Sequence, residues 1–144
     1  MIHKELLQSG RFVSGAPHSA ALGMEMVEVG PGFGVLKVRW REDLVGDAQT
    51  GVFAGGVVTA MLDHVCGLAV MAALTDLAQP ATIDLRIDYL RPAAPHLDLF
   101  ARADCYRLTR TVAFVRGSAY ETDPGHPVAI AQGTFVLNRE GDGR

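Results

Sequence analysis

The sequence predicts an α+β fold in which an antiparallel β-sheet is wrapped around one long central α-helix. Three observations lead to this prediction. Residues 52–74 form an almost wholly apolar stretch of 23 residues, two segments before it alternate apolar and polar residues, and four segments after it do the same. An antiparallel sheet with one buried face needs a cover, and the apolar stretch is long enough to provide it.

Before the apolar stretch, residues 4–9 favour a short helix, and residues 20–29 and 33–40 favour two strands. Gly30-Pro31-Gly32 lies between the two strands and is typical of a turn. We therefore expect an N-terminal β-hairpin.

The long helix is predicted over residues 55–74, and its clearly polar side chains are Thr59, Asp63 and His64. A stretch of this length and composition could cross a bilayer. A charged residue near the centre of a membrane helix costs about 2.5–3.5 kcal/mol on insertion scales, so Asp63 and His64 oppose insertion. We expect the buried helix of a soluble protein, with no membrane partner.

After the helix, apolar side chains at 83, 85, 87 and 89 alternate with polar ones at 82, 84, 86 and 88, which is typical of a strand with one covered face. Pro92 and Pro95 end this strand, and further strands are predicted over residues 97–106, 111–121 and 128–137. The breaks between these three are short enough for hairpins. The pattern predicts a meander of four strands and the order α-β-β-α-β-β-β-β for the chain.

Length and composition predict one domain over residues 1–144. Apolar residues make up 49%, charged residues 20%, and the net charge is −3, which is typical of a soluble folded protein and disfavours nucleic-acid binding. Cys66 and Cys105 are too few for a disulfide scaffold, so we expect free thiols in a reducing compartment, the cytoplasm. The first ten residues contain no apolar run of signal-peptide length.

Asp63 points most directly to chemistry, because it is a lone carboxylate in the middle of an apolar helix. Burial raises a carboxyl pKa toward the range where the group can transfer protons near neutral pH. The same helix opens with Gly55-Gly56, where bare backbone N–H groups can accept developing negative charge. A base and an oxyanion site in one segment indicate acyl chemistry.

Three segments then stand in order along the chain: GGVVTAMLD at residues 55–63, TIDLRIDYLRPA at residues 82–93 and AIAQGTF at residues 129–135. Together they resemble the hotdog fold and, within it, the acyl-CoA thioesterases of the phenylacetyl-CoA (PaaI-like) type, over about residues 22–137. The resemblance implies hydrolysis of an acyl-CoA to free acid and CoA, with the CoA thioester as substrate and no further cofactor.

By this resemblance Asp63 is the catalytic carboxylate, as nucleophile or as general base for water, and the N–H of Gly55 polarises the thioester carbonyl. Thr82 resembles the position where some relatives place a hydroxyl that orients the attacking water. Gly55 and Asp63 are about 12 Å apart along a helix, yet both must reach the same reacting atoms. One helix cannot supply both, so we expect a two-fold homodimer with shared sites, and the resemblance implies a dimer of dimers.

Substrate contacts are expected from Gly56 and Phe53 beside the helix start, and from Arg91 and Arg110. Guanidinium groups suit the phosphates of coenzyme A, although each arginine is equally well explained as a solvated surface residue. Further candidates for the phosphates and for the acyl pocket are Arg107, Leu62, Cys66 and Met71.

The sequence departs from the family at two positions, where Ala54 and Ala48 replace the usual His and Asn or Gln. Asp47, Gln49 and His64 are candidates to replace their polar groups. The departures keep a second interpretation open, a non-catalytic acyl-CoA or lipid-binding protein, and hydration of an enoyl-CoA is a further enzymatic alternative.

Several other reactive side chains are expected to be structural. His64 lies about 100° around the helix from Asp63 and is expected to pack elsewhere. Cys66 has no nearby Arg or Lys in the sequence to lower its pKa, so it is expected in the core. No metal site is expected, because the remaining histidines are scattered; they are His3, His18, His96 and His126.

Overall fold

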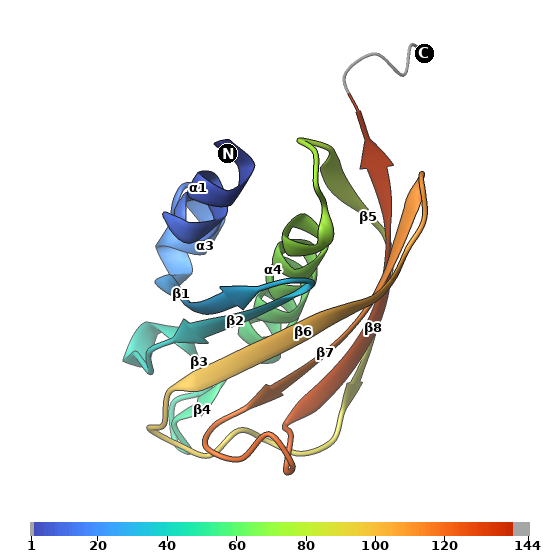
Figure 1. Ribbon diagram of the computed structural model, residues 1–144. Helices are drawn as coiled ribbons and strands as arrows, with labels where there is room; N and C mark the ends of the chain where they lie inside the picture. Colours follow the sequence, from blue (N-terminus) through green and yellow to red (C-terminus); the bar gives the residue numbers. More distant parts are fainter. Residues whose placement is uncertain (1, 140–144) are drawn as a thin grey trace.

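The apolar stretch forms the long helix α4 (Gly55–Ala73) in a computed structural model that describes residues 2–139. A six-stranded antiparallel sheet in the order β1-β2-β6-β7-β8-β5 curls around this helix (Figure 1). The predicted α+β architecture, an antiparallel sheet around a long central helix, is confirmed.

The other elements follow the chain in a simple order. They are α1 (Ile2–Gln8), α2 (Arg11–Ser14), α3 (Pro17–Leu22), β1 (Met24–Gly30), β2 (Phe33–Val38), a 3₁₀ turn (Glu42–Leu44), β3 (Val45–Asp47), β4 (Val52–Phe53), β5 (Gln79–Tyr89), β6 (Leu99–Leu108), β7 (Val112–Tyr120) and β8 (Ala129–Asn138). The strands β3 and β4 form a separate two-stranded hairpin that leads into α4.

The N-terminal segment is more helical than predicted. Pro17 occupies the first turn of α3, where its missing N–H costs no hydrogen bond, and Gly23 ends that helix in the left-handed conformation with φ 70°. The strand predicted over residues 20–29 therefore begins only at Met24, and α2 and α3 were not predicted. The hairpin of β1 and β2 is confirmed.

The predicted meander of four strands is wrong in one respect. The hairpins β6–β7 and β7–β8 are present, but β5 pairs with β8 at the far edge of the sheet and not with β6. The nine residues between β5 and β6 cross the end of the sheet, and the N–H of Leu90 donates to the carbonyl of Val128 at 2.8 Å. Alternation specifies which face of a strand is buried, and it does not specify the neighbouring strand.

A β-bulge interrupts the predicted alternation of β5. Thr82 pairs with Phe135 and Asp84 pairs with Thr134, so Ile83 is the extra residue between two consecutive ladder positions. Ile83 is 59% exposed, although the pattern predicted it on the covered face. Because of the bulge, Thr82 shares the face of the buried Phe135, which is the face that α4 covers.

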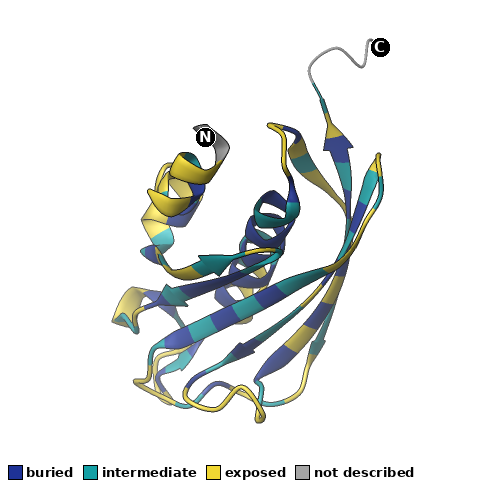
Figure 2. Ribbon diagram, viewed as in Figure 1, coloured by how far each residue is buried: buried dark blue, intermediate teal, exposed yellow. Residues whose placement is uncertain are grey.

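Helix α4 is the core of the domain, and the strands around it show alternating buried and exposed stripes (Figure 2). By length and composition alone the helix could cross a membrane, but 61% of its apolar window is buried inside this domain. The predicted buried helix is thus confirmed. Its sides differ, because Gly55, Gly56 and Thr59 are exposed and Asp63 is partly exposed.

Candidate active site

Asp63 and Thr82 lie together on the open side of α4. The Thr82 hydroxyl donates a hydrogen bond of 2.8 Å to Oδ1 of Asp63. Asp63 is partly exposed. The bulge at Ile83 explains why a residue from the predicted wet face of β5 reaches the helix. The result is a carboxylate that is held in place and still open to water.

The start of α4 presents the second predicted group. Gly55 and Gly56 are the first two residues of the helix and both are exposed, and Ala54 before them makes no side-chain capping bond. The first N–H groups of a helix have no partner within it, and the helix dipole makes them attractive to negative charge. This end of α4 can therefore accept an oxyanion.

Tyr89 at the end of β5 lies against this helix start, and sequence reasoning did not single it out. Its hydroxyl donates to the carbonyl oxygen of Gly55 at 3.3 Å and contacts the hydroxyl of Thr59. The signal for it in the sequence was weak, because Tyr89 continued an alternating pattern that a plain strand also explains. β5 thus touches α4 at both candidate groups, at Asp63 through Thr82 and at Gly55 through Tyr89.

His64 faces away from Asp63, as predicted. Its Nε2 lies 3.2 Å from the carbonyl oxygen of Phe12, its Nδ1 lies 3.5 Å from the hydroxyl of Ser19, and its ring stacks on Phe12. Burial lowers the pKa of His64, against smaller raising effects from the Phe12 carbonyl and from Asp63. The side chain joins α4 to the N-terminal helices, so it does not replace the polar groups absent at Ala48 and Ala54.

Cys66 is a core residue, as predicted. It is completely buried, and burial raises the pKa of its thiol to about 12. A thiol in this state is not a nucleophile near neutral pH.

The predicted substrate contacts lie in three different places. Gly56 is exposed at the helix start, and Phe53 is buried in the core just before it. Arg91 forms an ion pair of 3.0 Å with the buried Glu121. Arg110 lies in the β6–β7 turn at the opposite end of the sheet, where its carbonyl accepts a bond from Arg139. An eleven-residue strand such as β5 measures roughly 35 Å, so the two arginines of one chain do not meet one phosphate group.

The residues before the helix start have local roles. Ala48 lies in the β3–β4 turn, and Oδ1 of Asp47 accepts the N–H of Gln49 at 2.9 Å within that same turn. Asp47 therefore holds the hairpin that leads into α4, and this contact with Gln49 stays within the hairpin.

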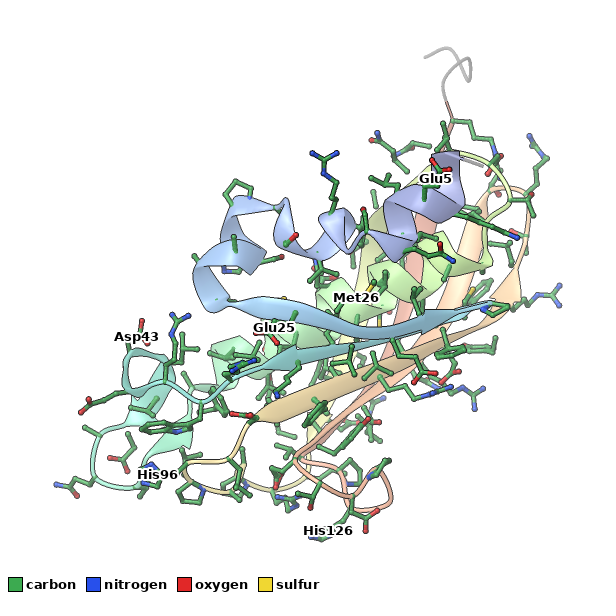
Figure 3. All side chains as sticks on the ribbon, turned by 60° about the vertical axis from the view of Figure 1, so that its left-hand side comes forward. Glu5, Glu25, Met26, Asp43, His96 and His126 are labelled. Atoms are coloured by element: carbon green, nitrogen blue, oxygen red, sulfur yellow. The ribbon has the colours of Figure 1, made fainter. Side chains whose placement is uncertain are left out.

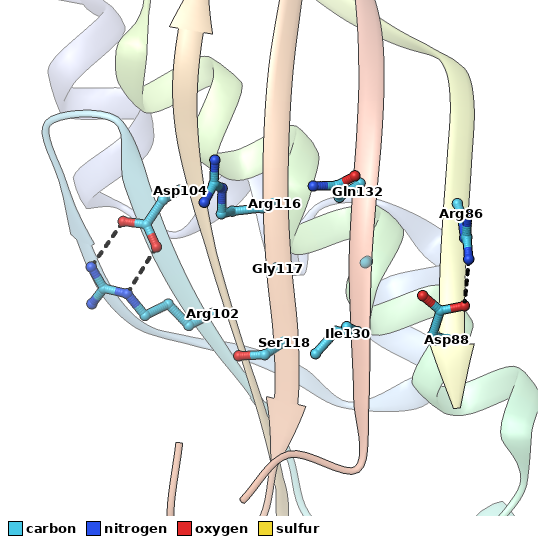
Figure 4. Close-up of a pocket in the computed structure, with 10 residues that line it drawn as sticks. Arg86, Asp88, Arg102, Asp104, Arg116, Gly117, Ser118, Ile130 and Gln132 are labelled. Atoms are coloured by element: carbon cyan, nitrogen blue, oxygen red, sulfur yellow. Dashed lines mark hydrogen bonds and ion pairs between the residues drawn. The ribbon is translucent and has the colours of Figure 1, made fainter. Parts of the chain in front are cut away.

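A polar hollow of about 580 Å³ lies on the outer face of the sheet, the face turned away from α4 (Figure 4). Arg102 is paired with Asp104 at 3.0 Å and Arg86 with Asp88 at 3.3 Å, and a third arginine of its lining, Arg116, lies over the ring of Tyr106. Within residues 2–139 no group of acidic, histidine or cysteine side chains could hold a metal ion. Figure 3 shows His96 and His126 in different loops. The predicted absence of a metal ligand at His3 concerns a side chain that the structure does not describe.

Residues 50–127 match the thioesterase superfamily. The chain belongs to the thioesterase superfamily. It is 35% identical over 139 residues to the medium/long-chain acyl-CoA thioesterase YigI of Escherichia coli K12, with 88% of each chain covered. The predicted hotdog family and the predicted class of enzyme, a thioester hydrolase, are confirmed.

Solved structures of relatives agree with this assignment. A crystal structure of a protein from Pseudomonas aeruginosa matches with a TM-score of 0.83 and 37% identity, covering 91% of this chain and 97% of that one. A mutant form of the phenylacetic acid degradation protein PaaI from Thermus thermophilus matches with a TM-score of 0.72 and 28% identity, covering 86% and 100%. The predicted resemblance to PaaI-like proteins is thus confirmed.

Proposed function

We propose that the chain hydrolyses acyl-CoA thioesters to a free acid and coenzyme A, with Asp63 as the catalytic carboxylate. One observation carries the proposal: Thr82 holds Asp63 on the side of α4 that the core leaves open. The similarity to YigI supports a CoA thioester as substrate and makes medium and long acyl chains the first to test.

Hydrolysis requires attack on the thioester carbonyl carbon and stabilisation of the resulting oxyanion. Asp63 acts either as the nucleophile, forming an acyl anhydride that water then cleaves, or as the general base that takes a proton from the attacking water. In both routes the Gly55 N–H stabilises the oxyanion, and the C–S bond breaks to release coenzyme A. Thr82 orients the carboxylate, or the water bound to it, through its hydroxyl.

We further propose that the site is shared between two subunits of a homodimer, which pairs into a dimer of dimers. Gly55 and Asp63 lie about 12 Å apart along α4, too far to act on one carbonyl from the same helix. β5 is an edge strand of the sheet, and the exposed apolar side chains along and just beyond it include Ile83 at 59% and Leu90 at 54%. An unpaired apolar edge favours pairing with another chain, and a two-fold axis there would bring each Gly55 toward the partner's Asp63.

The second candidate function is a binding protein that holds acyl-CoA without hydrolysing it. Ala54 favours it, because the helix start has no side-chain capping group and no polar side chain at the residue before Gly55. Such a protein would bind acyl-CoA and release no thiol.

The deciding experiment measures thiol release from a panel of short, medium, long and aromatic acyl-CoAs by wild type and by Asp63→Asn. We expect wild type to turn over at least one member and Asp63→Asn to lose about 10²–10⁴-fold in kcat, the usual range for a general acid–base group. The matched control is Asp84→Asn, because Asp84 is an exposed carboxylate on the outer face of the same β5 strand. It should keep wild-type turnover.

Two results would contradict the proposal. Full activity in Asp63→Asn would remove Asp63 from the mechanism. Acyl-CoA binding by wild type with no turnover of any panel member would establish the binding protein instead.

A further inference from the structure

Two hydroxyl groups converge on the carbonyl oxygen of Gly55. The Thr59 hydroxyl donates to it at 3.1 Å from one turn further along α4, and the Tyr89 hydroxyl donates at 3.3 Å from β5. The two hydroxyls also contact each other. The first peptide group of the helix is therefore tied both to the next turn and to a neighbouring strand.

No side chain caps the start of α4 with a hydrogen bond. Ala54 occupies the capping position without a side-chain hydrogen bond, and the next two residues, Gly55 and Gly56, have no side chains. Glycine has the widest backbone freedom of all residues, so two of them at an uncapped helix end favour fraying. The hydroxyls of Thr59 and Tyr89 restrain a segment that its own sequence leaves loose.

Restraining this carbonyl also orients an N–H group. The C=O of Gly55 and the N–H of Gly56 belong to one planar peptide unit, so fixing the first fixes the direction of the second. The N–H of Gly55 belongs to the preceding peptide unit, whose carbonyl, that of Ala54, accepts the N–H of Val57 at 3.0 Å. The N–H groups of Gly55 and Gly56 are the two donors assigned to the oxyanion and to substrate binding.

We infer that Tyr89 is a positioning residue that, together with Thr59, fixes the Gly55–Gly56 peptide so that the N–H of Gly56 points at the thioester oxygen. This inference rests on the proposed function. It also gives β5 a double role, since Thr82 positions the carboxylate at one point of the strand and Tyr89 positions the Gly56 donor at another. One strand then sets the geometry of both halves of the reaction.

The test is Tyr89→Phe, which removes the hydroxyl and keeps the ring. Removing an oxyanion donor costs about 10²–10³-fold in kcat, and misorienting it should cost a part of that, about tenfold. We expect kcat to fall by about this factor with KM changed less than about twofold, because the lost interaction acts in the transition state. The matched control is Tyr106→Phe, whose ring lies under Arg116 on the outer sheet face.

A second measurement separates positioning from stability and does not need activity. Backbone ¹⁵N relaxation should show the Gly56 order parameter falling from about 0.85, typical of rigid backbone, toward about 0.6 in Tyr89→Phe. Thr59→Ser should keep wild-type kcat, whereas Thr59→Val should resemble Tyr89→Phe.

An unchanged kcat in Tyr89→Phe overturns the inference, and so does a change in KM alone, which would make Tyr89 a substrate contact. If wild type hydrolyses no acyl-CoA, the proposed function fails. The Gly56 order parameter then decides whether Tyr89 fixes the start of α4. A lower Gly56 order parameter in Tyr89→Phe still supports a positioning role for Tyr89, and an unchanged order parameter overturns it.

Discussion

Asp63 and His64 are neighbours in the chain with separate surroundings. About 100° of helix rotation separates them, so one side chain faces β5 and the other faces the N-terminal helices. The sequence predicted that the two side chains diverge, because helical geometry alone determines the angle between them. The partner of each could not be predicted: Thr82 reaches Asp63 through a bulge, and Phe12 reaches His64 through a short helix that the alternating pattern did not reveal.

His64 should make the stability of the protein depend on pH. Its pKa is lowered in the folded state by burial, so below its ordinary value of 6.5 the unfolded chain binds more protons than the folded one. Its contribution to stability is therefore present above pH 6.5 and is lost as the pH falls below it. The free energy of unfolding in urea, measured from pH 7.5 to 5, should fall more steeply in wild type than in His64→Asn.

The charged and titratable groups that act electrostatically on His64 are Asp63 and His18, and His64→Asn alters neither of them. The same substitution at His126, an exposed residue in the β7–β8 turn, is the matched control. Parallel slopes for wild type and His64→Asn would contradict the prediction.

At the scale of elements, the sequence predicted the central helix and the β6–β7–β8 hairpins because periodicity and short turns are local signals. The position of β5 depends on pairing with β8, whose partner residues lie 40 to 59 positions later in the chain, and no local pattern contains this pairing. The bulge at Ile83 was hidden for a similar reason. A run of alternating residues looks regular until the partner strand defines which residue is extra.

Close approach of β2 to α4 is an element-scale feature that can be tested. A Cβ added to the buried Gly34 of β2 would lie 2.5 Å from Cδ2 of Leu68 on α4. Cγ of Leu68 would lie at 2.7 Å, and because Leu68 is completely buried, its side chain must repack within the core to accept the new methyl group. Gly34→Ala should therefore lower the free energy of unfolding by about 1–3 kcal/mol, as overpacking does.

The double variant Gly34→Ala/Leu68→Ala is the internal control for that clash. Leu68→Ala alone should cost about 2–5 kcal/mol through the cavity it leaves. Because the new methyl group partly fills this cavity, the double variant should cost less than the sum of the two single changes in urea unfolding. Strict additivity would show that the two residues do not crowd each other.

At the scale of the whole molecule, the proposed mechanism divides each active site into two halves. The two halves carried by one chain are too far apart to act on the same thioester molecule. The oxyanion donors at Gly55 and the carboxylate of Asp63 lie at separated points of one rigid helix, and the exposed edge strand β5 runs past both. In the proposed dimer, a second copy paired along that edge would bring the Gly55 of each chain to the Asp63 of the other. The single-chain fold thus contains a physical reason for the proposed dimer.

Mixing two inactive variants tests whether the site is shared. Asp63→Asn removes the carboxylate, and Gly55→Pro removes the N–H while proline remains favourable at the first helical position. The nearest heavy atom to a Cβ at Gly55 is Cε1 of Tyr89 at 3.9 Å, so the side chain has room. Refolded together in equal amounts, the variants should form about one-half heterodimers, each with one intact site, and recover about a quarter of wild-type activity.

A site contained within one chain gives a different result, because every chain in the mixture then carries one disabling change. The activity of the co-refolded mixture would stay at the level of the separate variants. The control is the same mixture combined without unfolding, in which each dimer keeps its original subunits and recovery should develop only as subunits exchange. If activity recovers only when mixed dimers form, Gly55 of one chain and Asp63 of another must act on the same thioester.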